Sequence, residues 1–187
     1  TSEVLMSLQD KYKNIVYLRN HASQGLSRSR MLGVNLAKGQ FIYFSDDDDT
    51  VLANRASTPL DWIMSHPYLD VVYCDYALTT NGKDVLYSNC RPYDFMEYLN
   101  LEFSIGSGIL LGRTKLFRKV PFHSIYDHAC DYDWVFRIVR AGYNIDYCPH
   151  VVMIYNRTGE INDHLAGTDK AFEQHAEIRK REEMLLS

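Results

Sequence analysis

The sequence predicts a single α/β domain in which short strands alternate with helices around a central mixed sheet. Apolar runs rich in β-branched and aromatic residues, such as 41–44 ("FIYF") and 69–78, are separated by segments with helical spacing, of which residues 131–142 are the clearest. This alternation is typical of a sheet flanked by helices. The 187 residues suffice for one domain with a sizeable core, and no internal repeat or low-complexity linker divides them.

The amino-terminal part is expected to begin with helical and strand segments in turn. Its expected elements are a helix at 3–13, a strand at 14–20, a polar loop at 21–30, a helix from Met31 to a stop at Gly39, and the strand at 41–44. A loop carries residues 46–51 ("DDDDTV"). A further helix then has Pro59 in its first turn and Pro67 after its end.

The carboxy-terminal part continues the alternation. Its expected elements are a strand at 69–78, a turn at 80–84, a helix at 93–102, a strand that becomes a helix over 106–117, a helix at 131–142 with Gly142 as its stop, two strands on either side of Pro149, and a charged helix at 169–186. The apolar stripe of the 131–142 helix consists of Trp134, Val135, Ile138 and Val139.

Composition excludes several classes of protein. A formal net charge of −4 argues against a general nucleic-acid binder, which usually has a basic excess. No apolar run approaches the roughly 18 to 20 residues that a membrane helix needs. No apolar signal segment opens the chain, so we expect a cytoplasmic protein, with peripheral association at the inner face of a membrane as a second expectation. The four cysteines lie too far apart in sequence for a zinc pattern.

Four consecutive carboxylates, Asp46 to Asp49, follow the strand at 41–44. Like charges this close repel each other, and open α/β sheets bind ligands beyond the carboxyl ends of their strands. Mg²⁺ or Mn²⁺ would offset the repulsion, because these cations prefer oxygen ligands and are often held by one or two carboxylates plus substrate phosphates. The alternative is a solvated acidic turn.

The segment that leads into this loop resembles family 2 glycosyltransferases, which have the GT-A fold. Their pattern N-x-G-x-x-x-A-R-N-x-G, followed by A-x-G and D-x-D-D, is matched by Gly25, Arg30, Gly33, Ala37, Gly39, Asp46, Asp48 and Asp49, with Asp47 in the variable place. Ser23 and Met31 replace two Asn residues of the pattern.

A second resemblance lies about 80 residues further on, in "CDYDWVFRIVRAGY". The family segment E-D-x-D-L-x-x-R-x-x-x-x-G is matched by Asp131, Asp133, Arg137 and Gly142, while Cys130 replaces the usual Glu. In the family, the residue matched by Asp131 acts as general base.

The resemblance covers roughly residues 12–157 and implies a GT-A domain that is incomplete at its amino terminus. The strands that hold the nucleobase and ribose in the family should precede Thr1. We therefore expect a partial GT-A domain at 1–168 and a separate carboxy-terminal helix at 169–187.

The resemblance also implies transfer of a hexosyl group from a nucleotide-diphosphate sugar, with UDP-sugars favoured, to an acceptor hydroxyl with inversion. The expected metal ligands are Asp48 and Asp46. The residues expected to contact the nucleotide sugar are Arg30, Asp46, Asp47 and Arg157, with His164 as a further candidate. The residues expected to support these groups from behind are Asp49, Asp133 and Arg137, of which the last two have the spacing of a helical ion pair.

Asp131 is the expected general base. The alternative is a helix N-cap, because Asp at a helix start accepts backbone N–H bonds. Arg30 could contact the phosphates or brace the acidic loop. The acceptor is expected to be a carbohydrate or a lipid-linked hydroxyl. Two other functions stay open: an inactive glycosyltransferase-like binding or assembly module, and a metal-dependent nucleotidyltransferase.

Overall fold

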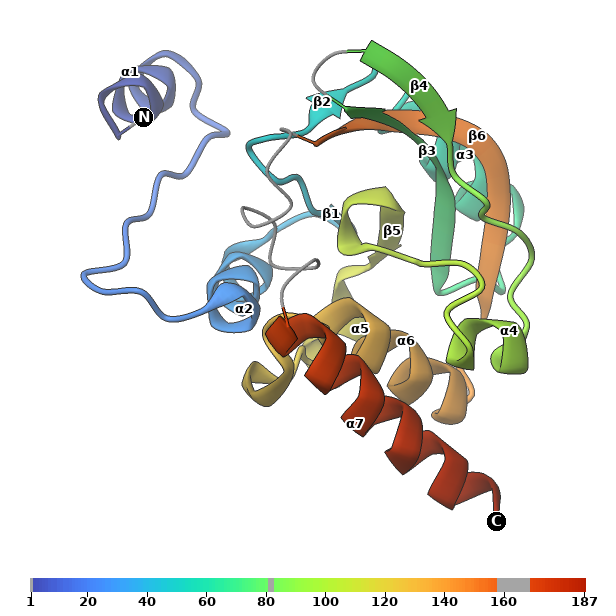
Figure 1. Cartoon of the computed structure of the whole chain (residues 1–187). Coiled ribbons are helices and arrows are strands. Elements are labelled where there is room, and N and C mark those ends of the chain that lie inside the picture. The colour runs from blue at the N-terminus through green and yellow to red at the C-terminus, as the bar shows by residue number, and fades with distance from the viewer. Residues whose placement is uncertain (1, 81–82, 158–168) are drawn as a thin grey trace.

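A six-stranded mixed sheet forms the centre of the computed structural model, which describes residues 2–80, 83–157 and 169–187. The strand order is β1-β5-β3-β6-β2, with β4 paired to β3 beside this path (Figure 1). The strands are β1 (Phe41–Tyr43), β2 (Thr50–Val51), β3 (Val71–Thr80), β4 (Lys83–Tyr87), β5 (Leu110–Arg113) and β6 (Ile145–Arg157). β3 and β6 run parallel and the other pairs are antiparallel, which confirms the mixed sheet.

Helices flank the sheet, as predicted. The α-helices are α1 (Ser2–Lys11), α2 (Leu26–Leu36), α3 (Ser57–Ser65), α4 (Phe95–Leu99), α5 (Thr114–Lys119), α6 (Cys130–Arg140) and α7 (Asp169–Leu186), and two 3-10 turns are η1 (Ser107–Ile109) and η2 (Ser124–Tyr126). In Figure 1, α3 lies behind β3 and β6, while α2, α5, α6 and α7 gather below the sheet. No helix of the described ranges is both long and apolar enough to cross a bilayer.

The core is built around α6. Of its predicted apolar stripe, Trp134, Val135 and Ile138 are buried and Val139 is half-buried. The Trp134 ring stacks on Phe117 of α5 with centroids 4.6 Å apart, and its Nε1–H donates to the Val120 carbonyl at 2.6 Å. Gly142 has φ +79° directly after the α6 cap, and the N–H groups of Gly142 and Tyr143 donate to carbonyls in the last turn of the helix. This left-handed stop confirms the predicted end of the helix.

The strand predicted at 14–20 is wrong. These residues follow α1 as extended chain, and no strand of the described residues pairs with them. Val16 is 68% exposed and Leu18 is 49% exposed, so their β-branched and apolar character is not used in a sheet. Sequence propensity favours a strand, but a strand also needs a neighbour for its N–H and C=O groups.

The boundaries predicted for the helix before β1 are also wrong. α2 begins at Leu26, inside the predicted loop, because Gly25 takes φ +81° and a carboxylate from Asp127 accepts the Ser27 N–H at 2.9 Å. It ends at Leu36, where Ala37 turns to an extended conformation. Gly39 therefore lies beyond the cap and is not the stop.

Residues on either side of Pro149 form one strand rather than two. β6 runs through Pro149, and its register against β3 shifts between the pairs Cys74–Cys148 and Asp75–Val151. Pro149 has no N–H to give to the ladder, and a bulge is where a sheet tolerates this loss.

α7 packs against α6 and buries one face, including Ile178 of the core cluster. The division of the chain into 1–168 and 169–187 stays a prediction.

Candidate active site

The acidic loop is fixed at its far end by Asn156 of β6. β1 delivers Asp46, Asp47 and Asp48 to the surface, where all three are exposed. The Nδ2–H of Asn156 donates to the Asp48 carbonyl and to Thr50 Oγ1, both at 2.9 Å. A backbone held in this way presents its carboxylates in a defined arrangement. Sequence reasoning missed Asn156, which lies 108 positions away from Asp48.

Asp49 differs from its three neighbours because it points inward. Its Oδ1 is buried and has no hydrogen-bond partner among the described residues. Burial, followed by the charges of Asp48 and Asp46, raises the pKa of Asp49 to about 6, although Arg55 and the backbone of Asn156 oppose this rise. The loop thus concentrates negative charge that a cation would stabilise.

The residues of this loop fit a divalent cation of the Mg²⁺ or Mn²⁺ type. Carboxylate oxygens are the ligands that these cations prefer, and an orphaned buried oxygen at Asp49 adds a further acceptor. No group of three or more His, Cys, Asp or Glu side chains within the described ranges is arranged to hold a metal by itself. Metal ligation by Asp48 and Asp46 stays a prediction.

Arg30 connects the acidic loop to α6. Its side chain is only 8% exposed, and its Nη2 donates to both carboxylate oxygens of Asp46 at 3.1 and 3.2 Å. Its Nη1 lies 3.5 Å from Cys130 Sγ at the start of α6. Burial opposes the charged form, but Cys130, Asp131 and Asp46 raise the pKa of Arg30 overall. Of the two roles considered for Arg30, this geometry supports bracing of the loop.

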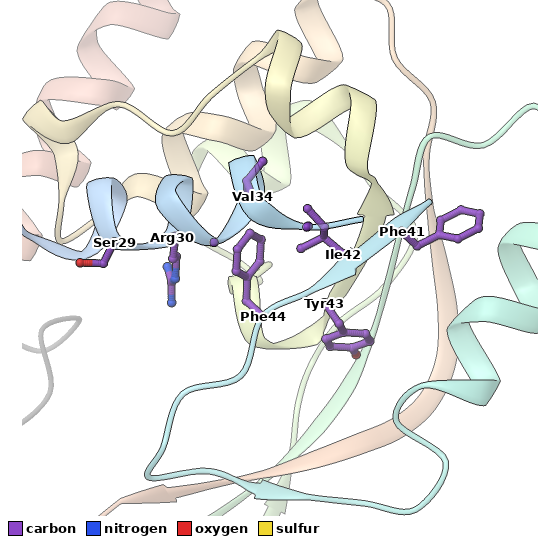
Figure 2. A pocket seen from close by; sticks show the side chains of 9 residues that line it. Ser29, Arg30, Val34, Phe41, Ile42, Tyr43 and Phe44 are labelled. Carbon is purple, nitrogen blue, oxygen red and sulfur yellow. The ribbon is translucent and has the colours of Figure 1, made fainter. Parts of the chain in front are cut away.

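Arg30 also borders a hollow between α2 and β1 with a volume of about 370 Å³. Figure 2 shows Phe44 and Ile42 facing α2, with Arg30 at one end. The residues around the hollow are mostly apolar or aromatic, so Arg30 and Ser29 provide its polar end.

Asp131 lies in the first turn of α6 and is half-buried. Its Oδ2 accepts the Ser107 N–H at 3.1 Å and its Oδ1 accepts the Tyr132 N–H at 3.0 Å. The N-cap position itself belongs to Ala129. The carboxylate is therefore oriented by two backbone donors, one of them from a distant turn, and it remains partly accessible.

The turn η1 lies between Asp131 and the acidic loop. A Cβ on Gly106 would be 3.9 Å from Asp131 Oδ2, and a Cβ on Gly108 would be 3.7 Å from Asp49 Oδ2. Asp131 thus approaches the residue that precedes η1, and Asp49 approaches the middle residue of η1. Segments that are about 80 residues apart in sequence meet here.

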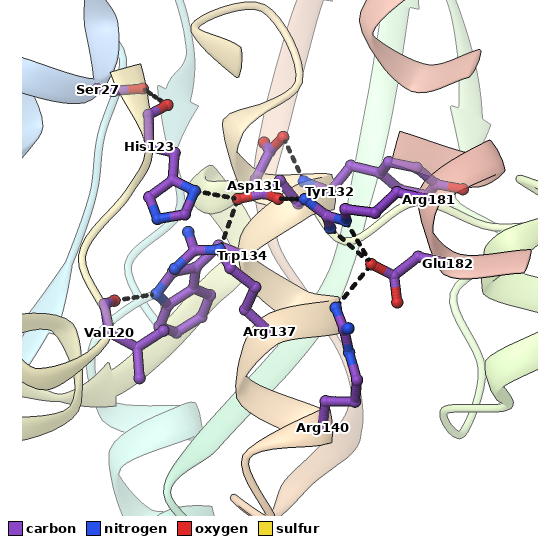
Figure 3. A network of polar contacts seen from close by, with 11 residues as sticks. Ser27, Val120, His123, Asp131, Tyr132, Trp134, Arg137, Arg140, Arg181 and Glu182 are labelled. Carbon is purple, nitrogen blue, oxygen red and sulfur yellow. Dashed lines mark hydrogen bonds and ion pairs between the residues drawn. The ribbon is translucent and has the colours of Figure 1, made fainter. Parts of the chain in front are cut away.

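The other acidic residues near α6 are occupied by structural contacts. Asp133 is fully buried and bonds Arg137 Nε at 2.7 Å, which confirms the predicted helical ion pair, and Arg181 Nη1 at 2.6 Å (Figure 3). Asp127 accepts the Ser27 N–H of α2 and fills the space where a Cβ on Gly25 would lie. Within the described residues Asp133 is held by salt bridges, whereas Asp127 and Asp131 are held by backbone N–H groups.

Cys130 takes the place of the family's usual Glu. Burial, followed by the charge of Asp131, raises the pKa of its thiol to about 12, so the side chain is neutral. Arg157 ends β6 opposite Thr80, but its side chain and the whole of His164 lie outside the described residues. Their predicted contacts with the nucleotide stay predictions.

Comparisons with known proteins agree on one family. The family described as "Glycosyl transferase family 2" matches residues 1–126. An uncharacterized glycosyltransferase, MJ1057 of Methanocaldococcus jannaschii, is 23% identical over 162 residues, which are 82% of this chain and 54% of that protein. An uncharacterized glycosyltransferase of Haemophilus influenzae is 30% identical over 59 residues, or 32% of this chain and 20% of that protein.

Solved structures have the same fold. S. aureus TarS superposes with a TM-score of 0.65 over 95% of this chain and 31% of that chain, at 17% identity. S. aureus TarS 1-349 in complex with UDP superposes with a TM-score of 0.56 over 81% of this chain and 47% of that chain, at 19% identity. The chain spans about half the length of its first curated relative. The matched family is one of glycosyltransferases, which argues against the nucleotidyltransferase alternative. The chain belongs to the family 2 glycosyltransferases, with the GT-A fold.

Proposed function

We propose that this enzyme transfers a sugar from a UDP-sugar to the hydroxyl of a carbohydrate or lipid-linked acceptor, with inversion at the sugar carbon. The family supports sugar transfer from a nucleotide sugar, and TarS has been solved in complex with UDP. The choice of UDP for this chain is part of the proposal.

Asp131 acts as the general base in this reaction. The acceptor oxygen attacks the anomeric carbon from the face opposite the leaving group. Its proton passes to the Asp131 carboxylate, the new carbon–oxygen bond forms, and the bond to the diphosphate breaks and releases the nucleotide diphosphate. The N–H groups of Ser107 and Tyr132 fix the carboxylate for this task, because each bonds a different oxygen. Such proton transfer typically contributes about 10² to 10⁴ in rate.

The acidic loop binds the diphosphate end of the donor. Asp48 and Asp46 are the proposed metal ligands, and a bound Mg²⁺ or Mn²⁺ stabilises the charge that develops on the departing diphosphate. Asp47 and Arg157 contact the nucleotide sugar, while Arg30 holds Asp46 in place through its two contacts. Asp49 supports the ligands from the interior.

The observation that carries this proposal is the position of η1 between Asp131 and Asp49. A transferase must hold the leaving diphosphate and the acceptor proton on opposite sides of one reacting carbon. The carboxylates beside Gly106 and Gly108, one at the start of α6 and one in the acidic loop, support such an arrangement.

The substitution Asp131→Asn tests the proposal. Asn keeps the shape but is not a base, so turnover should fall by at least about 10² while donor affinity stays near that of the wild type. Asn has one acceptor oxygen for two N–H donors, so a loss of about 1 kcal/mol in stability is also expected. Hydrolysis of a panel of UDP-sugars measures turnover, and calorimetry measures donor binding.

Asp94→Asn is the matched control, because Asp94 caps α4 by accepting the Glu97 N–H at 2.9 Å and has no proposed role in the reaction. It should leave turnover unchanged. Turnover of Asp131→Asn within a few-fold of the wild type would leave Asp131 with a structural role alone.

A further inference from the structure

Arg55 is a buried cation whose side chain lies against the end of β1. It follows β2 in sequence and is only 5% exposed. Its Nη2 donates to the Phe44 carbonyl, its Nη1 lies 3.8 Å from Met153 Sδ, and its Cζ lies 4.4 Å from the centre of the Tyr43 ring. The guanidinium therefore contacts the last residues of the chain before the acidic loop begins.

Its charge is not neutralised by a salt bridge within the described residues, and this distinguishes it from Arg30. Arg30 pairs directly with Asp46, whereas the contacts of Arg55 are a carbonyl, a thioether and an aromatic face. Burial of a cation is costly unless nearby groups compensate its charge. The Phe44 carbonyl and the face of the Tyr43 ring supply part of that compensation.

Arg55 and Asn156 hold the two ends of the loop. Arg55 binds the Phe44 carbonyl at its entry, and Asn156 binds the Asp48 carbonyl near its exit. Met153 links this arrangement to η1, because its Sδ lies beside Arg55 and 3.2 Å from the position of a Cβ on Gly108.

We infer that Arg55 is a positioning residue that holds the acidic loop in the geometry that binds a divalent cation. This inference rests on the proposed metal site. Arg55 is too deeply buried to contact the donor, so it acts through the loop. Groups that orient metal ligands in this way typically change metal affinity by about 10- to 100-fold when they are removed.

The direction in which Mn²⁺ affinity changes on loss of Arg55 distinguishes a positioning role from a purely electrostatic one. A positive charge near the loop repels a second cation, so its loss alone should tighten Mn²⁺ binding. Loss of a positioning contact should weaken Mn²⁺ binding, because the carboxylates are no longer held together. The two readings therefore predict changes of opposite sign.

Mn²⁺ binding by the 187-residue chain in the presence of UDP, whose diphosphate completes the proposed site, tests the inference without any turnover when it is measured from the signal of free Mn²⁺ in electron paramagnetic resonance. Arg55→Met keeps the length and removes the charge and the hydrogen bonds, and its Kd should rise about tenfold or more.

Arg113→Met is the matched control. Arg113 also donates to carbonyls, those of Leu69 and Pro67, and stacks over an aromatic ring, that of Phe41, but at the opposite end of β1. Its Kd for Mn²⁺ should match that of the wild type.

An Arg55→Met protein with unchanged or tighter Mn²⁺ binding would overturn the inference, as would an equal loss in Arg113→Met. If Arg55→Met does not fold, Arg55→Lys decides by the same measurement, since Lys keeps the charge but cannot make all three contacts. A Kd raised at least about threefold supports positioning, and an unchanged Kd refutes it. A wild-type chain that binds no Mn²⁺ would contradict the metal site itself and the inference with it.

Discussion

Replacement of Asp133 by Asn should destabilise the domain far more than loss of an exposed ion pair. Asp133 is fully buried in α6 and bonds Arg137 at 2.7 Å and Arg181 at 2.6 Å. It therefore joins its own helix to α7. Figure 3 shows its partners Arg137 and Arg181. His123 approaches the same carboxylate at 3.7 Å, but burial and the neighbouring Arg137 lower its pKa, so it adds little positive charge at neutral pH.

The expected loss in the free energy of unfolding follows from the two arginines that Asp133→Asn leaves without their carboxylate. Asn keeps one acceptor oxygen and loses the negative charge, so two arginines remain that are only 15% and 30% exposed. Removal of one partner from a buried ion pair typically costs about 3 to 5 kcal/mol. Arg181 keeps a second carboxylate, that of Glu182, at 2.6 Å, so we expect the lower end, about 3 kcal/mol.

Urea unfolding followed by circular dichroism measures this change through the midpoint and slope of the transition. The control is Glu97→Gln, which breaks an exposed pair with Arg91 at 3.5 Å and should cost less than about 1 kcal/mol. Equal and small losses in the two variants would refute the reasoning, because they would mean that the Asp133 charge is solvated in the folded protein.

Two further predictions concern packing and pH. Gly112→Ala should destabilise the domain by about 1 to 3 kcal/mol, because the new Cβ would lie 2.8 Å from the buried Phe117 ring; an unchanged urea midpoint would contradict it. Burial lowers the pKa of His175, whose ring lies 4.9 Å from that of Tyr132. As the pH falls, His175 binds its proton more readily in the unfolded chain than in the folded one. The contribution of the neutral His175 ring to the free energy of unfolding is therefore complete above about pH 6.5 and is lost as the pH falls below it. His175→Phe should reduce the loss of stability between about pH 7 and pH 5, and an unchanged loss would count against this assignment.

The sequence predicted those features that depend on local signals. The acidic loop after β1, the Gly142 stop of α6 and the Asp133–Arg137 pair all lie within a few residues of the pattern that indicates them. The features that it missed depend on distant partners. Arg55 contacts Met153 across 98 positions, and Asn156 reaches Asp48 across 108. Propensity and spacing carry no information about such contacts until the sheet brings them together.

The same limit explains why Asp131 and Asp133 look alike in sequence but differ in environment. They are two residues apart on one helix, so their side chains are separated by about 200° around its axis. Asp133 consequently faces α7 and is enclosed by arginines, while Asp131 faces η1 and is only half-buried. The oxygens of Asp133 are occupied by two arginines in the interior, whereas the carboxylate of Asp131 is held by two N–H groups and stays partly accessible to an acceptor. Helical geometry thus places Asp133 in the interior, where it stabilises the fold, and it places Asp131 at the edge of the site, where proton transfer is proposed.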